Sequence, residues 1–206
     1  MHDGGVKRAT AVRHVREMAE EASGLLRLRE TEIGWPLEEL WAAGDLLGDR
    51  ETIEAGTVVL MVDVAPEELP WLAVHPVGEW VGERLGLGKR PFPWFYRPML
   101  WPAWNPAHRR VARVWTAGDG VDAAALEALG TGGFDGVVVA EPSATQAREQ
   151  FGVELVAARR HLHEILECYW DRDWRAEHRR PRRPEDHLWR SAQGVREIES
   201  AIGARR

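Results

Sequence analysis

The chain is poor in cysteine and has no long apolar run. Cys168 is its single cysteine, which excludes an intramolecular disulfide and is typical of a reducing compartment. No apolar stretch approaches the roughly 20 residues that span a bilayer, and the charged N-terminal stretch lacks the apolar centre of a signal peptide. These absences predict a cytoplasmic protein that does not enter a membrane.

An excess of positive charge is missing too. The 206 residues carry a formal net charge of −6, with an isoelectric point near 5.8, so composition gives no general attraction to nucleic acid or anionic membranes. Apolar residues make up 44% of the chain, enough for a sizeable core. Tryptophan is abundant instead: there are 11, and five lie between Trp71 and Trp104.

The apolar pattern predicts an α+β fold. Helical periodicity covers residues 6–29, and apolar, β-branched segments predict strands. Such strands are expected at 57–64, 111–116 and 136–140, and the mixed segment 37–43 is expected to be a strand because of what surrounds it. Later helices are expected at 122–129, 144–175 and 185–203. We therefore expect a small mixed sheet with flanking helices over 1–140, followed by a C-terminal helical hairpin over 141–206.

Residues 70–110 form a distinct segment. Its seven prolines argue against long regular elements, and its aromatic residues argue against a disordered linker. One hypothesis is that Trp94, Trp101 and Trp104, with Arg97 and His108, line a pocket that stacks a planar ligand. The alternative, which we favour for most of the rings, is that they bury this excursion against the sheet. A Trp-rich surface could also form a homodimer interface.

Two short segments carry a family resemblance. Leu40–Asp45 and Thr57–Asp63 read as a strand, a Gly-containing turn and a second strand. This order resembles minimal nucleotidyltransferases, including the antitoxin type, in which a Gly-Ser turn is followed by a strand carrying Asp-x-Asp. A helical hairpin follows the catalytic sheet in several of those enzymes. The chain is also similar to an uncharacterised actinobacterial family with a degenerate form of this pattern.

The chain departs from that pattern where the chemistry lies. In the nucleotidyltransferase pattern, two carboxylates hold a divalent metal ion, but Thr57 and Val59 stand near those positions here. Asp45 stands where the pattern has the serine of the turn. We therefore expect neither a metal site nor a cofactor. The leading hypothesis is a non-catalytic binding or regulatory protein, whose small-molecule or protein partner enters near the Gly44–Asp45 turn and the aromatic excursion. The candidate ligand-binding residues are Trp41, Asp45, Trp94, Arg97, Trp101, Trp104 and His108.

Two alternatives stay open. One is an enzyme whose acidic site combines Asp45, Asp63 and His108 across a cleft. The other is a nucleic-acid partner protein in which arginines bind phosphates beside Trp170 and Trp174. The arginines concerned are Arg172, Arg175, Arg179, Arg180, Arg182 and Arg183.

Two further motifs lack the residues their chemistry needs. Gly86–Lys89 lacks the glycine spacing and the Ser or Thr of a phosphate loop. His163 and Glu167 share a helix face at a spacing suited to metal, but they would need a third ligand from elsewhere.

Overall fold

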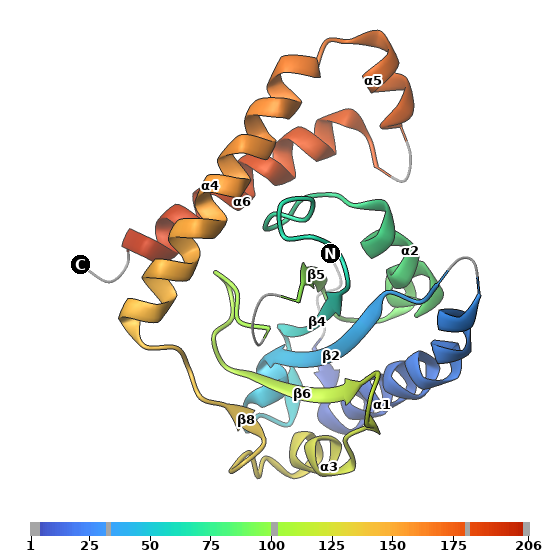
Figure 1. The fold of residues 1–206 in the computed structure, drawn as a ribbon. Helices are drawn as coiled ribbons and strands as arrows, with labels where there is room; N and C mark the ends of the chain where they lie inside the picture. Colours follow the sequence, from blue (N-terminus) through green and yellow to red (C-terminus); the bar gives the residue numbers. More distant parts are fainter. Residues whose placement is uncertain (1–4, 32–33, 100–102, 180–181, 204–206) are drawn as a thin grey trace.

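The computed structural model describes residues 5–31, 34–99, 103–179 and 182–203, so Trp101 and Arg180 lie outside the described residues. The fold is the expected α+β arrangement (Figure 1). A mixed sheet has helices beside it, and a pair of long C-terminal helices lies across the molecule.

The six-stranded sheet has the order β5-β4-β2-β6-β7, with β8 also pairing with β6. Only the β4–β5 pair is parallel among the described strands; the others are antiparallel. The strands are β2 (Leu37–Gly44), β4 (Gly56–Val62), β5 (Trp94–Pro98), β6 (Val111–Thr116), β7 (Gly120–Val121) and β8 (Val138–Val139). A separate antiparallel pair joins β1 (Val6–Lys7) to β3 (Thr52–Ile53). The predicted strands at 37–43, 57–64 and 111–116 are confirmed, and the one at 136–140 shortens to β8.

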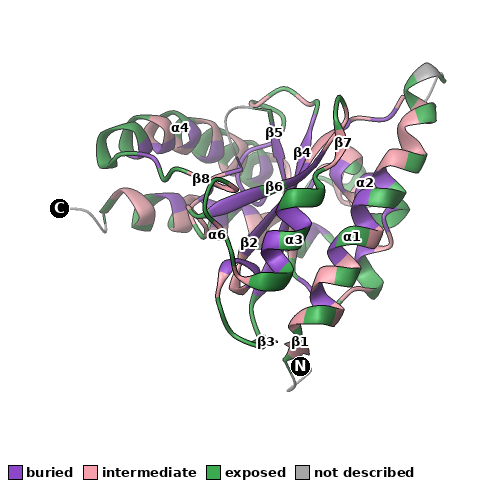
Figure 2. Ribbon diagram, turned by 90° about the horizontal axis from the view of Figure 1, so that it is seen from below, coloured by how far each residue is buried: buried purple, intermediate pink, exposed green. Residues whose placement is uncertain are grey.

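One face of the sheet packs against helices α1 (Arg8–Leu25), α2 (Pro76–Arg84) and α3 (Ala123–Thr131). The buried stripe of α1 includes Val15, Met18 and Ala22, at the helical spacing that predicted it. Every residue of β4 is buried, because the opposite face of the sheet is covered as well. Figure 2 shows the buried strands between α1 and α3 on one side and α4 and α6 on the other.

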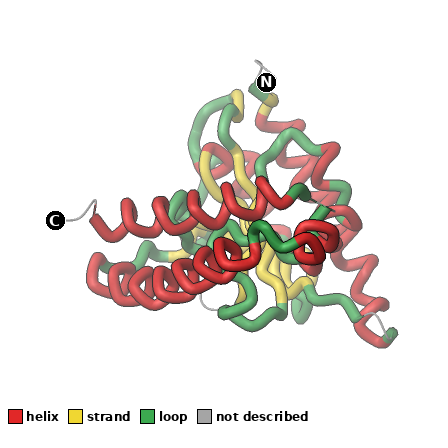
Figure 3. Tube along the Cα trace, turned by 90° about the horizontal axis from the view of Figure 1, so that it is seen from above, coloured by secondary structure: helices red, strands yellow, loops and turns green. Residues whose placement is uncertain are grey.

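The opposite face carries a smaller apolar cluster, which includes Trp41, Val59 and Ala103, with Trp104 packed against it. The hairpin formed by α4 (Ala144–Cys168) and α6 (Pro184–Gly203) packs over this side (Figure 3). A third cluster, around Trp71 and Phe151, joins these helices to the core.

The expected helix over 144–175 is interrupted. Helix α4 ends at Cys168, and the short helix α5 (Arg172–Glu177) begins after three intervening residues. The side chain of Asp171 accepts hydrogen bonds from the backbone N–H groups of Asp173, at 2.9 Å, and Trp174, at 2.8 Å. An aspartate in this role starts a new helix, because its carboxylate satisfies N–H groups that would otherwise lack partners.

At the far end of the hairpin, α5 packs against α6 through rings. Trp174 stacks on His178 with a centroid separation of 4.2 Å, and His178 meets His187 edge-on at 4.9 Å. His187 is only 8% exposed. Burial, together with the charges of His178 and His161, lowers the pKa of His187 to about 4.

The proline-rich stretch 70–110, in which no long element was expected, contains the 9-residue helix α2 and the 5-residue strand β5. Pro76 occupies the first turn of α2, where a backbone N–H would have no partner within the helix, so its absence costs nothing. Pro93 precedes the edge strand β5, and Pro98 is its last residue. A Cβ at Gly78 would lie 2.4 Å from the ring of Tyr96, and one at Gly82 would lie 2.5 Å from the ring of Trp94. The two glycines therefore form the surface on which the β5 rings pack.

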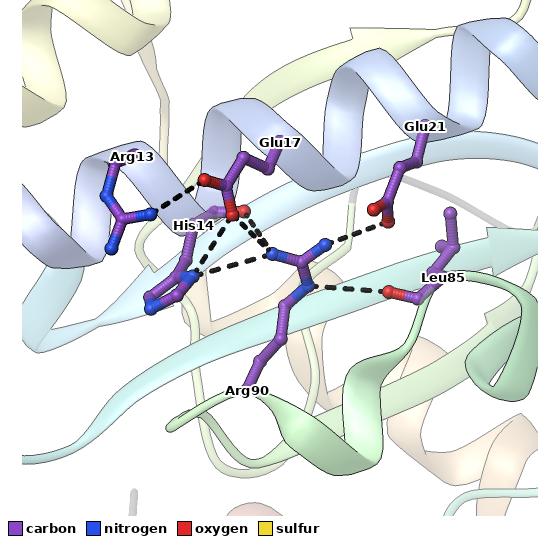
Figure 4. Close-up of polar contacts among 6 residues, drawn as sticks. All are labelled: Arg13, His14, Glu17, Glu21, Leu85 and Arg90. Carbon is purple, nitrogen blue, oxygen red and sulfur yellow. Dashed lines mark hydrogen bonds and ion pairs between the residues drawn. The ribbon is translucent and has the colours of Figure 1, made fainter.

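The remaining short helices are η1 (Leu26–Glu30), η2 (Asp45–Leu47) and η3 (Leu87–Lys89). Arg90, just after η3, is held against α1 (Figure 4). Its guanidinium lies 2.9 Å from a carboxylate oxygen of Glu17 and 2.8 Å from one of Glu21. The same guanidinium lowers the pKa of Glu17. The Gly86–Lys89 segment, which lacks the residues of a phosphate loop, therefore leads into a residue that joins this part of the chain to α1.

The Trp71–Leu72 loop is clamped between the core and α6. Leu72 has a φ of 63° and is the only non-glycine residue with positive φ among those described. Its carbonyl accepts a hydrogen bond from Nε of Arg190 at 3.0 Å. A Cβ at Gly194 would lie 2.2 Å from the carbonyl oxygen of Trp71, so α6 approaches this loop as closely as glycine allows.

Candidate functional site

A cleft of about 860 Å³ opens where β2 ends, where the chain enters β6 and where α6 ends. We call it the base cleft, because it lies at the end of the hairpin away from α5. The residues that line it are Gly44, Pro106, Ala107, His108, Arg109, Arg110, Glu141, Arg196, Glu197, Ser200 and Ala201.

The first wall of the base cleft is the turn after β2. Gly44 has a φ of 64°, and a Cβ there would lie 2.4 Å from the carbonyl oxygen of Ala55, so glycine is required. Asp45 follows, and its carboxylate accepts hydrogen bonds from the N–H groups of Ala55, at 3.0 Å, and Glu54, at 3.3 Å. Asp45 therefore holds the turn together, and it is not among the residues that line the cleft.

The second wall is shaped by Asn105, a fully buried residue. Its Oδ1 accepts hydrogen bonds from the N–H groups of Ala107, at 3.0 Å, and His108, at 2.8 Å, and its Nδ2 donates to the carbonyl of Ala103. These bonds fix the loop that carries His108. Asn105 is not among the site residues predicted from the sequence, although the Asn-Pro dipeptide at 105–106 is a turn signal.

Arginines dominate the charge of the base cleft. Arg109 donates to the carbonyl of Ala201 at 3.3 Å, and its guanidinium lies over the ring of Phe151. Arg110 donates to the carbonyl of Leu47 at 2.9 Å. Arg196 is exposed on α6 and makes no hydrogen bond or ion pair with the residues that the structure describes. None of these three arginines is among the site residues predicted from the sequence.

The acids of the cleft are Glu141 and Glu197. Glu197 accepts hydrogen bonds from Trp71 Nε1 and Gln193 Nε2, both at 2.8 Å, so it is largely committed to structure. Burial lowers the pKa of His108, and the charge of Glu197 partly opposes this. His108 is therefore neutral at pH 7, and the three arginines of the lining outnumber its two glutamates.

The acidic enzyme site proposed from the sequence is not assembled. Leu37 pairs with Val62 and Gly44 with Gly56, so Asp45 and Asp63 lie at opposite ends of the β2–β4 pair. Asp45 lies level with Ala55, eight residues before Asp63 on the partner strand. At about 3.3 Å per residue, the two acids are separated by about 25 Å. One substrate cannot contact both carboxylates, which corrects the hypothesis that Asp45, Asp63 and His108 act together.

The aromatic excursion does not form one pocket either. Successive side chains of β5 alternate between faces, so Trp94 packs against α2 while Arg97 points toward the hairpin. Arg97 is 3% exposed and forms a 2.8 Å ion pair with Glu154 of α4. Trp41 and Trp104 belong to the small cluster on the sheet. Of the candidate ligand-binding residues within the described part of the chain, only His108 lines the base cleft.

The arginine run is partly committed to structure. Arg175 lies 2.6 Å from a carboxylate oxygen of Glu185, and Arg182 lies 2.9 Å from one of Glu79 on α2. Arg172, Arg179 and Arg183 are exposed. Nucleic-acid binding stays a prediction, which now rests on these exposed members.

Within the described residues, no group of three or more His, Cys, Asp or Glu is placed to hold a metal ion. His163 and Glu167 form an exposed pair at 3.2 Å on α4. Nor is any helix in that part of the chain long and apolar enough to cross a bilayer.

Comparison with known proteins identifies the family alone. Residues 6–204 match the family model described as a domain of unknown function, DUF7711. No match was found among curated proteins or among solved structures. Because the match covers nearly the whole chain, the protein belongs to the DUF7711 family.

Proposed function

We propose that this protein is a non-catalytic binding or regulatory protein on a nucleotidyltransferase-like scaffold, and that it binds a small anionic molecule in the base cleft. The observation that carries the proposal is the set of arginines gathered in a cleft of about 860 Å³. That volume falls within the range of roughly 300–1,000 Å³ usual for small-molecule sites.

The sheet supports the non-catalytic part of the proposal. Thr57 and Val59, at the positions that the nucleotidyltransferase pattern reserves for carboxylates, are buried. Val59 lies in the apolar cluster with Ala103, and Trp104 packs against the same cluster. A nucleotide phosphate with its metal ion would need this face to be open and charged. The scaffold is therefore better suited to binding than to transfer.

The geometry of the base cleft supports an anionic ligand. Arg196 projects a guanidinium that no described residue pairs, and a planar guanidinium matches the oxygens of phosphate or carboxylate groups. Arg110 and Arg109 add positive charge from the opposite wall, with their positions set by backbone carbonyls. Neutral His108 can accept a hydrogen bond from a ligand hydroxyl or donate one to an oxygen.

Calorimetric titration with AMP, ATP and inorganic phosphate tests this function. We expect at least one of these anions to bind and to raise the melting temperature through mass action. The Arg196→Ala variant should weaken that binding by about tenfold, whereas Arg16→Ala, at an exposed position on α1, should leave it unchanged. Failure of all three anions to bind would reject the anion site, and Mg²⁺-dependent transfer of AMP from ATP would reject the non-catalytic assignment.

Nucleic-acid binding at the far end of the hairpin is a second candidate. Trp170 is 83% exposed there, which is unusual for so large an apolar side chain. It lies two residues from Arg172, and exposed rings beside arginines suit unpaired bases and phosphates.

A further inference from the structure

A second cleft, of about 640 Å³, lies at the opposite end of the β2–β4 pair from the base cleft. It forms where the chain enters β2 and leaves β4, beside the beginning of α2. The N–H of Asp63 donates to the carbonyl of Pro36 at 2.8 Å, which fixes the rim. We call it the indole cleft, after its two tryptophans.

The walls of the indole cleft are aromatic and apolar. Trp35 and Trp80 line it and meet edge-to-face, with ring centroids 5.4 Å apart and planes at 67°. Pro36, Pro76 and Val77 complete the apolar lining. The rings come from different elements, since Trp35 precedes β2 and Trp80 lies on α2. Both are held by the core, so their arrangement exists without a ligand.

The ring of Trp80 already attracts a cation within the protein. The guanidinium of Arg84 lies 5.6 Å from its centroid, which is the geometry of a cation–π contact. An indole is the best aromatic partner for such contacts, because its negative quadrupole is the largest of the side chains. The indole cleft therefore offers surfaces suited to a positively charged group.

The fixed charges point the same way. Glu38 lines the cleft and is paired with Arg29, so these two charges largely cancel. Asp63 is exposed at the rim and makes no ion pair with any residue that the structure describes. Among the residues that line the cleft, one carboxylate is thus left without a paired cation, while Arg84 lies outside the lining and over the ring of Trp80.

We propose that the indole cleft binds a compact organic cation, of the quaternary-ammonium or methylated-amine class. The methyl groups would pack against Trp80, Val77 and the prolines, with the 3% exposed Trp35 supporting the ring of Trp80 from the core. A strongly hydrated ammonium would lose its water there. Asp63 would supply the countercharge at the rim. This site is separate from the base cleft in position and opposite to it in charge, so it does not depend on the proposed function.

The test uses the full chain and a matched pair of ligands. Choline chloride supplies the cation, and 3,3-dimethyl-1-butanol is its neutral isostere. We expect choline to bind detectably by calorimetry and the neutral alcohol to bind at least about fivefold more weakly. Absence of choline binding, or equal binding of the two ligands, would overturn the proposal.

Variants locate the binding. Asp63→Asn changes one exposed group and should weaken choline binding by about fivefold, whereas Asp135→Asn, a control at another exposed position, should not change it. Trp80→Leu should weaken it by about tenfold. Arg196→Ala, in the base cleft, should leave it unchanged. Choline binding that survives both Asp63→Asn and Trp80→Leu would refute the site; if the latter fails to fold, Asp63→Asn decides alone.

Discussion

Acidification should destabilise this protein through His187, at the far end of the hairpin. The folded-state pKa of His187 is about 4, against an ordinary value of 6.5. Burial is the main cause, followed by the charges of His178 and His161 and a smaller effect of Arg182, with Asp186 acting in the opposite direction. The unfolded chain therefore takes up the proton at higher pH than the folded chain. Stability from this group is fully present above pH 6.5 and is lost as the pH falls toward 4.

The magnitude follows from the difference in pKa. A shift of 2.5 corresponds to about 3 kcal/mol in total, of which about 2 kcal/mol is lost between pH 7.5 and pH 5. Because whole domains are stable by only about 5–15 kcal/mol, this loss is readily measured.

Urea unfolding at pH 7.5, 6.5, 5.5 and 5 measures the effect. Burial also lowers the pKa values of His75, His108 and His161, so the wild-type slope contains several contributions. His187→Gln removes one of them, and its pH dependence should be shallower by about 2 kcal/mol over this range. His163→Gln, on the exposed side of α4, serves as the control. If His187→Gln and the wild type lose stability equally on acidification, the reasoning is refuted.

Three further predictions concern the hairpin. Gly194→Ala should destabilise the protein by about 1–3 kcal/mol in urea unfolding, because its Cβ would lie 2.2 Å from the Trp71 carbonyl oxygen; unchanged stability would contradict this close approach. Arg97→Ala should reduce the free energy of unfolding by about 3–5 kcal/mol, since it leaves Glu154 buried without this partner; a loss below about 1 kcal/mol would contradict it. If the hairpin end binds single-stranded RNA, electrophoretic mobility shifts should show salt-sensitive binding that is lost on joint replacement by alanine of Arg172, Arg179 and Arg183; binding unchanged in that variant would remove this candidate.

The sequence predicted the elements whose own residues determine them. Strands β4 and β6 followed from apolar and β-branched runs, and α1 from its periodic stripe. The mixed segment of β2 was expected to be a strand only because of what surrounds it. Helix α2 was missed because prolines dominated the interpretation of its segment. Its glycines at 78 and 82 provide the surface on which Tyr96 and Trp94 pack. That role depends on β5, which is distant along the chain.

The base cleft could not be predicted from local patterns. His108 was chosen for its residue type, whereas Arg196 comes from the last helix and meets the loop only through the packing of the hairpin. By contrast, the separation of Asp45 and Asp63 could be predicted from the sequence, because it follows from antiparallel pairing of the two strands. Two strands joined by a short connection place the end of one beside the start of the other.

The left-handed backbone of Leu72 makes the core energetically dependent on the hairpin. A non-glycine residue with positive φ costs about 1–3 kcal/mol unless its surroundings hold it there. Those surroundings are Arg190 and Gly194, both on α6. A substitution of Arg190 or Gly194 would remove a contact that holds this loop in its conformation. We therefore expect the residues tolerated at 72 to depend on those at 190 and 194. In evolutionary terms, the two parts of the chain are expected to change together at this contact.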